Sequence, residues 1–203
     1  MPTLLYLHEV AAAQTGIYPI AELSSSTPDV TWVDANTLRQ MNTTIGTGQT
    51  AAAHVLAATG LQIHFIRFWV TPFLSGAQTV GGGTARFNCA DQESSLSNDF
   101  WINGLNIYVV RPSTGAVVGT LIDQVGALGG SEPTTINSEQ VTRFTFATVA
   151  VASADGDVVI CEAWSTFTPA ATGTLGFAYD GTTENDVENA VVSNHASVFE
   201  LAE

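Results

Sequence analysis

The chain contains no lysine, so arginine is its only strongly basic residue. Its five arginines face nineteen Asp and Glu residues, which gives a formal net charge of −14 over 203 residues. The absence of an amine side chain excludes a Walker-type phosphate loop, a Schiff-base enzyme and a lysine isopeptide cross-link. It also argues against nucleic-acid binding, because that affinity comes from many Lys and Arg contacts with phosphates. We therefore predict no nucleic acid among the partners.

Cysteines, charges and long apolar runs are scarce as well. Cys89 and Cys161 are the only cysteines, they match no metal-ligand spacing, and two free thiols are a simpler interpretation than a disulfide. The most apolar window, from about residue 55 to 74, is interrupted by Arg67 and Pro72. The uninterrupted apolar runs that remain are too short for a membrane span. We therefore predict neither a secretory signal nor a membrane partner. The apolar share of 45% is that of a folded globular chain.

From residue 61 onward, the sequence consists of short runs rich in β-branched and aromatic residues. Clusters of Gly, Pro, Asp and Ser separate the runs, and no long amphipathic helical run interrupts them. The runs cover residues 61–71, 84–89, 101–111, 116–123, 141–152, 158–167, 175–179 and 197–201. This pattern predicts an all-β fold, an antiparallel β-sandwich with a jelly roll as the favoured topology.

The first sixty residues have a different texture. One strand-like run, Thr3–His8, is followed by polar stretches rich in Ser, Thr, Ala and Gly, and Ala51–Ala58 is compatible with one or two helical turns. The region lacks the large apolar residues that a core of its own requires. We therefore divide the chain into an extended N-terminal arm or set of outer strands used in assembly, residues 1–60, and a β-sandwich domain, residues 61–203.

One carboxylate stands on a predicted apolar strand face. Val158, Ile160, Glu162 and Trp164 alternate along their run and so share a face. If that face is the core, Glu162 is buried, and a buried carboxylate requires a partner or a raised pKa. Arginine is the only available cation apart from a protonated histidine. We predict that Arg111, at the end of a neighbouring run, is the ion-pair partner of Glu162.

The best metal candidate is the acidic segment that contains Asp180, Glu184 and Asp186. Closely spaced carboxylate oxygens suit Ca2+, but the spacing does not match an EF-hand loop. A solvated turn rich in Asp and Gly is the simpler interpretation, and no other cofactor is predicted. Trp32 lies in the polar N-terminal region and is the tryptophan that we expect at an interface.

Sequence motifs of enzymes are incomplete in this chain. Residues 46–51 fit a dinucleotide-binding pattern, but no acidic residue follows at the distance of about 20 residues that the ribose contact needs. His8 and Glu9 begin a zinc-protease motif in which Ala12 replaces the second histidine. No Gly-x-Ser-x-Gly nucleophile elbow occurs. We therefore predict no catalytic residues and a chain that is not an enzyme.

Four segments of the last hundred residues form a recognisable set by their order and spacing. They are Tyr108–Ala116, Gly156–Trp164, Phe177–Thr183 and Ala196–Leu201. Together with the short Leu4–Leu7 run and the loop at 46–50, they resemble structural proteins encoded in the virion modules of tailed bacteriophages. The resemblance implies a jelly-roll-like module on a virion head or tail, usually a symmetric oligomer, without catalytic residues.

This resemblance sets the functional expectation. We expect a virion protein, assembled in the cytoplasm of the bacterial host, that decorates or cements the capsid and stabilises capsomer contacts. Its partner would then be the major capsid protein, and it would form a homo-oligomer, with a trimer as the guess. A tail, baseplate or fibre component bound to other tail proteins is the alternative. From another class, a carbohydrate-binding module for host attachment is possible, and a glycosidase comes last.

Overall fold

The computed structural model describes residues 3–12, 31–33, 38–43, 50–56, 60, 63–124, 140–179 and 198–201. These residues form strands, turns and loops without a helix, so the predicted all-β fold is confirmed for the described part of the chain. It follows that these residues contain no helix of the length and hydropathy needed to cross a membrane.

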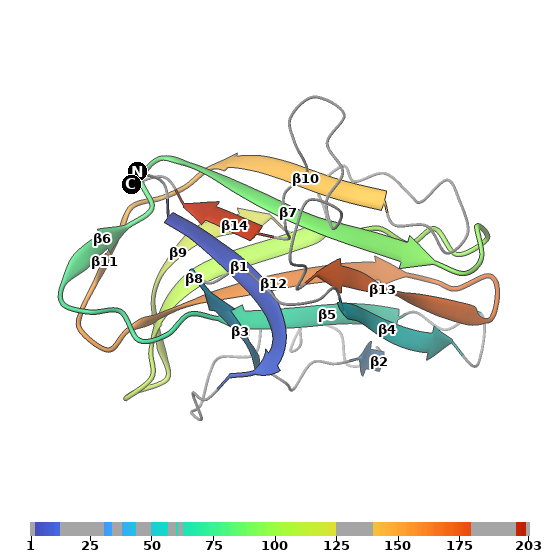
Figure 1. Cartoon of the computed structure of the whole chain (residues 1–203), viewed down its shortest axis with the longest axis horizontal. Coiled ribbons are helices and arrows are strands. Elements are labelled where there is room, and N and C mark those ends of the chain that lie inside the picture. The colour runs from blue at the N-terminus through green and yellow to red at the C-terminus, as the bar shows by residue number, and fades with distance from the viewer. Residues whose placement is uncertain are drawn as a thin grey trace.

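The strands are numbered in chain order (Figure 1). The first seven are β1 (Thr3–Ala11), β2 (Thr31–Val33), β3 (Leu38–Asn42), β4 (Thr50–Leu56), β5 (Ile63–Val70), β6 (Gln78–Val80) and β7 (Thr84–Glu93). The others are β8 (Gly104–Arg111), β9 (Ala116–Gln124), β10 (Gln140–Ala147), β11 (Val151–Ser153), β12 (Val158–Phe167), β13 (Gly173–Tyr179) and β14 (Val198–Leu201).

Most of these strands belong to one continuous hydrogen-bonded sheet. Its order is β4-β13-β7-β14-β1-β3-β5-β12-β8-β9, with β10 paired to β7 and β2 paired to β5. The pairs are antiparallel except that β2 and β3 each run parallel to β5. The short strands β6 and β11 form a separate two-stranded sheet at one end of the molecule (Figure 1).

The large sheet curves so that strands far apart in its order share one core. The rings of Trp69 in β5 and Phe87 in β7 lie 6.4 Å apart between centroids, although three strands separate β5 from β7 in the sheet. Figure 1 shows β7 and β10 along the upper side of the molecule and β5 and β12 below them. The main hydrophobic cluster therefore fills the space that the curved sheet encloses.

Strand β12 is buried on both of its faces. Val159 and Cys161 point into the main core, whereas Val158 and Ile160 belong to a second, smaller cluster with Val70, Tyr108 and Val110. The alternation predicted from the sequence is thus correct, and the face that carries Glu162 is the face of the smaller cluster. This double burial explains the almost continuous apolar sequence of the strand.

The described N-terminal strands take part in the same sheet and core. Leu5 and Leu7 of β1 and Met41 of β3 are buried in the main cluster, so no break in the core coincides with residue 60. The helical turns expected for Ala51–Ala58 are wrong, because residues 50–56 form β4 and pair along their length with β13. Cross-strand hydrogen bonds here override the helix propensity of alanine. A role of residues 1–60 in assembly stays a prediction.

Candidate functional site

An aromatic side chain is exposed in the loop between β5 and β6. Phe73 is 60% exposed, and it is the one aromatic among the large exposed hydrophobic side chains of the described residues. It lies next to Pro72, in a loop that follows directly on a buried part of β5. An exposed phenyl ring of this kind costs free energy in a lone molecule, and it therefore marks a candidate contact surface.

Hydrogen bonds hold the backbone of this loop directly after the exposed ring. Leu74 N donates to the Asp157 carbonyl at 2.7 Å, and Gly156 N donates back to the Leu74 carbonyl at 2.9 Å. Gly76 N donates to Asp155 Oδ1 at 2.8 Å. Because these bonds connect the loop to the turn before β12, the position of Phe73 is fixed by a distant part of the chain.

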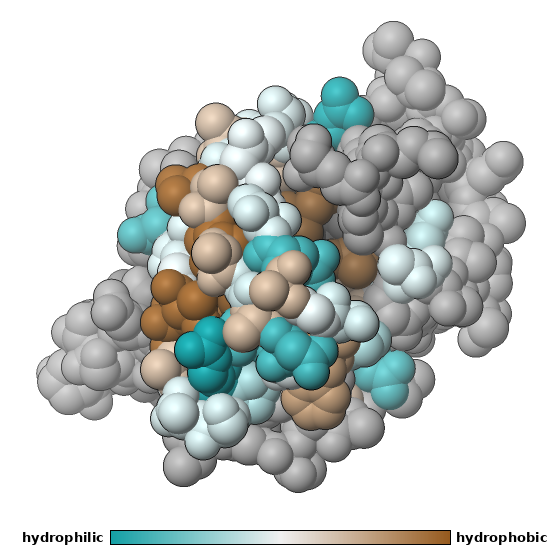
Figure 2. Space-filling view, turned by 90° about the vertical axis from the view of Figure 1, so that its left-hand side faces the viewer, coloured by the Kyte–Doolittle hydropathy of each residue, from teal (hydrophilic) through white to brown (hydrophobic). Residues whose placement is uncertain are grey.

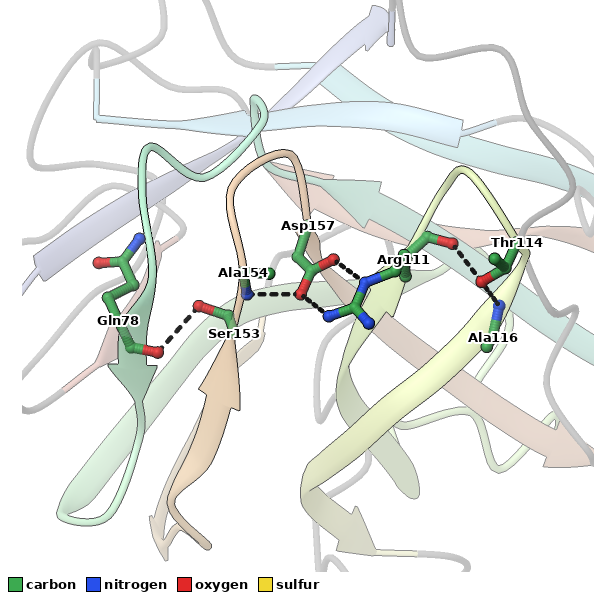
Figure 3. Close-up of polar contacts among 7 residues, drawn as sticks. All are labelled: Gln78, Arg111, Thr114, Ala116, Ser153, Ala154 and Asp157. Atoms are coloured by element: carbon green, nitrogen blue, oxygen red, sulfur yellow. Dashed lines mark hydrogen bonds and ion pairs between the residues drawn. The ribbon is translucent and has the colours of Figure 1, made fainter.

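A buried carboxylate, that of Asp157, holds the turn before β12. Asp157, whose side chain is 1% exposed, accepts from Arg111 Nε and Nη2 at 3.0 Å each and from Ala154 N at 2.8 Å (Figure 3). The hydrogen bonds from Arg111 hold the pKa of Asp157 below its ordinary value. The Arg111 carbonyl also accepts from Thr114 Oγ1 at 3.4 Å, which ties the β8–β9 turn to the same group.

Two further contacts support the neighbouring two-stranded sheet. Ser153 Oγ of β11 donates to the Gln78 carbonyl of β6 at 3.0 Å (Figure 3). Thr148 Oγ1 accepts from Gly82 N and Gly83 N at 3.0 and 3.2 Å, just after β10 ends. This turn divides the predicted run 141–152 into the separate strands β10 and β11.

A cavity of about 300 Å3 opens beside Phe73. Its apolar lining comes from Leu5 of β1, Pro72, Phe73 and Leu74 of the loop, Val80 and Gly81 near β6, Val159 of β12 and Leu201 of β14. Its polar lining is Thr43, Thr71, Ser75, Gln78 and Thr79, and no charged side chain of the described residues lines it. Figure 2 looks onto this end of the molecule and shows hydrophobic patches between hydrophilic ones. We refer to this cavity with the exposed Phe73 as the Phe73 groove.

The predicted ion pair between Arg111 and Glu162 is wrong. The register between β8 and β12 places Val158 opposite Val110 and Glu162 opposite Asn106. Arg111 therefore lies beside Asp157, and Glu162 lies about 17 Å farther along β12, at about 3.3 Å per residue. The sequence predicted correctly that Glu162 is buried, but the local residue pattern does not show the register that places Arg111 beside Asp157.

Glu162 is fully buried, as expected, and its partner is a tyrosine. The Tyr108 hydroxyl donates to Glu162 Oε1, whereas Glu162 Oε2 has no hydrogen-bond partner. Burial raises the pKa of Glu162 to about 8, and hydrogen bonding from Tyr108 and Asn106 limits this rise. The pKa of Tyr108 is also raised, first by burial and then by the neighbouring carboxylate. Glu162 is therefore protonated in most of the molecules at neutral pH.

The remaining predicted site residues are not placed by the structure. Asp180, Glu184 and Asp186 lie outside the described residues, so the Ca2+ site stays a prediction. Trp32 belongs to β2, whose backbone pairs with β5, but its side chain lies outside the described part. Within the described part, no group of three or more His, Cys, Asp or Glu side chains is arranged to hold a metal ion.

Comparison with known proteins finds structures of similar fold, but it does not assign the chain to a family. No protein-family model matches the chain, and no curated protein does. An aminopeptidase from a marine sediment archaeon, Thaumarchaeota archaeon, matches 80% of this chain and 35% of its own, at 10% identity and a TM-score of 0.51. A CocE/NonD family hydrolase from Staphylococcus aureus matches 99% of this chain and 36% of its own, at 8% identity and a TM-score of 0.49. The structure of infectious bursal disease virus strain Gt matches 99% of this chain and 54% of its own, at 10% identity and a TM-score of 0.23.

The aminopeptidase match corrects the prediction that the chain is not an enzyme. This chain shares the fold of part of that protein at a TM-score of 0.51, so a fold of this kind occurs within an enzyme. At these identities the likeness concerns the fold alone. The chain spans only about a third of the length of either protein.

Proposed function

We propose that this chain is a structural assembly protein of a tailed-bacteriophage virion, a jelly-roll β-sandwich that decorates the capsid. The observation that carries the proposal is the Phe73 groove, where an aromatic side chain is 60% exposed on a hydrogen-bonded loop beside an uncharged cavity. Aromatic anchors held in a fixed conformation are typical of the residues that dominate protein–protein binding energy. This surface suits a protein whose work is to attach to other subunits.

Three further features support this proposal. The curved sheet encloses one main hydrophobic cluster, in keeping with the packed core of a β-sandwich. Leu5 and Thr43 line the groove, so N-terminal residues lie at the proposed contact, in keeping with a role of this region in stabilising capsomer contacts. The absence of lysine and the net charge of −14 suit a protein kept away from packaged DNA.

The proposal is tested by copy number and by a matched pair of variants. In purified virions, quantitative mass spectrometry should find the chain at hundreds of copies for a capsid decoration protein, against tens for a tail component. Particles that lack the chain should bind wild-type protein and the Leu96→Asp variant, since Leu96 is 44% exposed but does not line the groove. They should not bind Phe73→Asp. Absence of the chain from virions would end the proposal.

A second candidate function follows from the aminopeptidase match. Because this chain covers 35% of that protein, it has the size and fold of one β-rich unit within a longer hydrolase. This alternative predicts that the purified chain, or a larger protein that contains it, releases nitroaniline from aminoacyl nitroanilides. No release above buffer, together with high copy number in virions, would remove this candidate.

A further inference from the structure

We propose that the Phe73 groove is a contact between two copies of this chain, in which Phe73 of each copy occupies the groove of the other. The inference deepens the proposed assembly function and rests on it for its biological meaning. The projecting ring and the cavity lie side by side on one surface, since Phe73 itself forms part of the cavity wall. A two-fold contact requires this arrangement, because the same patch of both subunits must be self-complementary.

The size of the groove fits a side chain better than a small-molecule ligand. Its volume of about 300 Å3 is at the lower limit for ligand pockets, which range from about 300 to 1,000 Å3. Its walls are aliphatic around Leu5, Leu74 and Leu201, and the polar groups at its edge are uncharged hydroxyls and an amide. A phenyl ring with its flanking proline is a suitable occupant, and the loop that holds Phe73 provides both.

The charge distribution favours a second copy over a basic partner. No charged residue occurs in the sequence between Arg67 and Arg86, which is the segment that supplies the loop and β6. A chain with a net charge of −14 repels its own copies, and this neutral surface is where two copies approach with the least repulsion. A basic partner would instead be recognised by acidic side chains around the cavity, and none of the described lining residues is acidic.

The groove is also rigid before contact. The loop is held through Leu74 and Gly76 to the turn at Asp155–Asp157, and that turn is held by Arg111. Ordering a flexible loop on association costs free energy, and this loop is already ordered in the single chain. The contact therefore needs no rearrangement of either copy.

The test is the molar mass of the full chain in solution, measured by sedimentation over a range of concentrations. We expect a wild-type dimer and, for Phe73→Asp, an affinity between the two copies that is lower by a factor of roughly thirty or more. Ser75→Trp, which fills the groove from an exposed loop position, should have the same effect without touching Phe73. Leu96→Asp is the control and should remain dimeric.

Each other outcome counts against the proposal. A monomeric wild-type chain, or a dimer that survives both Phe73→Asp and Ser75→Trp, would overturn the two-fold contact. Circular dichroism of each variant shows whether it is folded, so loss of the dimer by unfolding is recognised. A monomer that is nevertheless abundant in virions would refute this contact and leave the proposed assembly function standing. A chain that forms the dimer but is absent from virions would refute the assembly function and leave the two-fold contact standing.

Discussion

Glu162 is a buried acid surrounded by neutral groups. Tyr108 and Asn106 face it from β8, and Phe68 lies opposite it on β5. Its Oε2 atom lacks a hydrogen-bond partner, as does the nearby Trp164 Nε1 on the same strand face. Ionising this carboxyl inside the sheet is costly, whereas the protonated form fits the apolar surroundings. The stability of the protein should therefore depend on pH through the titration of Glu162.

The sign of this dependence follows from the raised pKa. In the unfolded chain Glu162 titrates near 4.5, and in the folded protein near 8. Its protonation therefore stabilises the fold fully below pH 4.5, and the stabilisation is lost as the pH rises through 8, at about 1.4 kcal/mol per pH unit. Glu162→Gln should match the wild type at pH 5 and exceed its unfolding free energy by a few kcal/mol at pH 8.5.

Urea unfolding of both proteins across this pH range measures the effect. Asp99→Asn is the control, because Asp99 is an exposed acid in the loop between β7 and β8. It should leave the pH dependence unchanged. Equal pH dependence of Glu162→Gln and the wild type would contradict the prediction.

At the scale of structural elements, the Arg111–Asp157 pair connects the β8–β9 turn with the turn before β12. Asp157 holds the turn before β12, and this turn holds the loop of Phe73. Asp157→Ala removes an acceptor of three hydrogen bonds and should lower the melting temperature by several degrees, more than Arg111→Ala does. In both variants the amides of Leu74 and Gly76 should exchange hydrogen faster. Unchanged exchange in Asp157→Ala would show that the turn does not hold the loop.

The same pair gives a pH dependence opposite to that of Glu162. Because its pKa is lowered from the ordinary value of 3.8, the Asp157 carboxylate stabilises the fold above that value. The stabilisation is lost as the pH falls below 3.8 toward the lowered pKa. Asp157→Ala should therefore flatten the acid side of the stability profile and leave the alkaline side as it is.

Strands β8 and β12 are in close contact at Gly104, a glycine of β8. The indole ring of Trp164 lies against the backbone of Gly104, so an added Cβ there would overlap the ring. Gly104→Ala should reduce the unfolding free energy by about 3 kcal/mol or more, because both groups are buried and cannot move apart. Gly156→Ala is the control, since its surroundings are open and its φ of +83° costs only about 1 kcal/mol. Denaturant unfolding followed by tryptophan fluorescence compares the two variants.

The sequence indicated the long strands well and the short ones poorly. The run predicted at 158–167 coincides with β12, and the run at 116–123 differs from β9 by one residue. The short strands β3 and β6 were not predicted, because they are polar and exist through hydrogen bonds to distant partners. The Ala-rich β4 was mistaken for helical turns for the same reason. Local composition identifies a strand only where a buried face gives it a regular pattern of apolar residues.

The candidate site was less predictable than the fold. Phe73 follows Trp69 and Val70 in an apolar stretch, and composition alone places all three in the core. Its exposure depends on hydrogen bonds between its loop and residues some eighty positions later in the chain. The partner of Arg111 depends likewise on the register between two strands that are distant in sequence. Both features arise from long-range pairing, about which the local residue pattern contains no information.

At the scale of the whole molecule, the net charge of −14 opposes any association of two copies. Salt shortens the reach of this repulsion, from about 30 Å at 0.01 M to about 10 Å at 0.1 M ionic strength. The Phe73 groove contains no charge among its described lining residues, so salt does not weaken the contact itself. We therefore expect the dimer to become tighter as NaCl is raised across this range, whereas an interface held by ion pairs would become weaker.

Sedimentation of the wild type at both ends of the salt range measures this difference. Phe73→Asp should remain monomeric at both ends, which shows that salt acts on the proposed contact and not through general aggregation. A wild-type dimer that dissociates as salt is added would mean that opposite charges hold it. Because the described groove offers none, such a contact would have to lie on another surface, with the excess of acids in the last sixty residues as its source of charge.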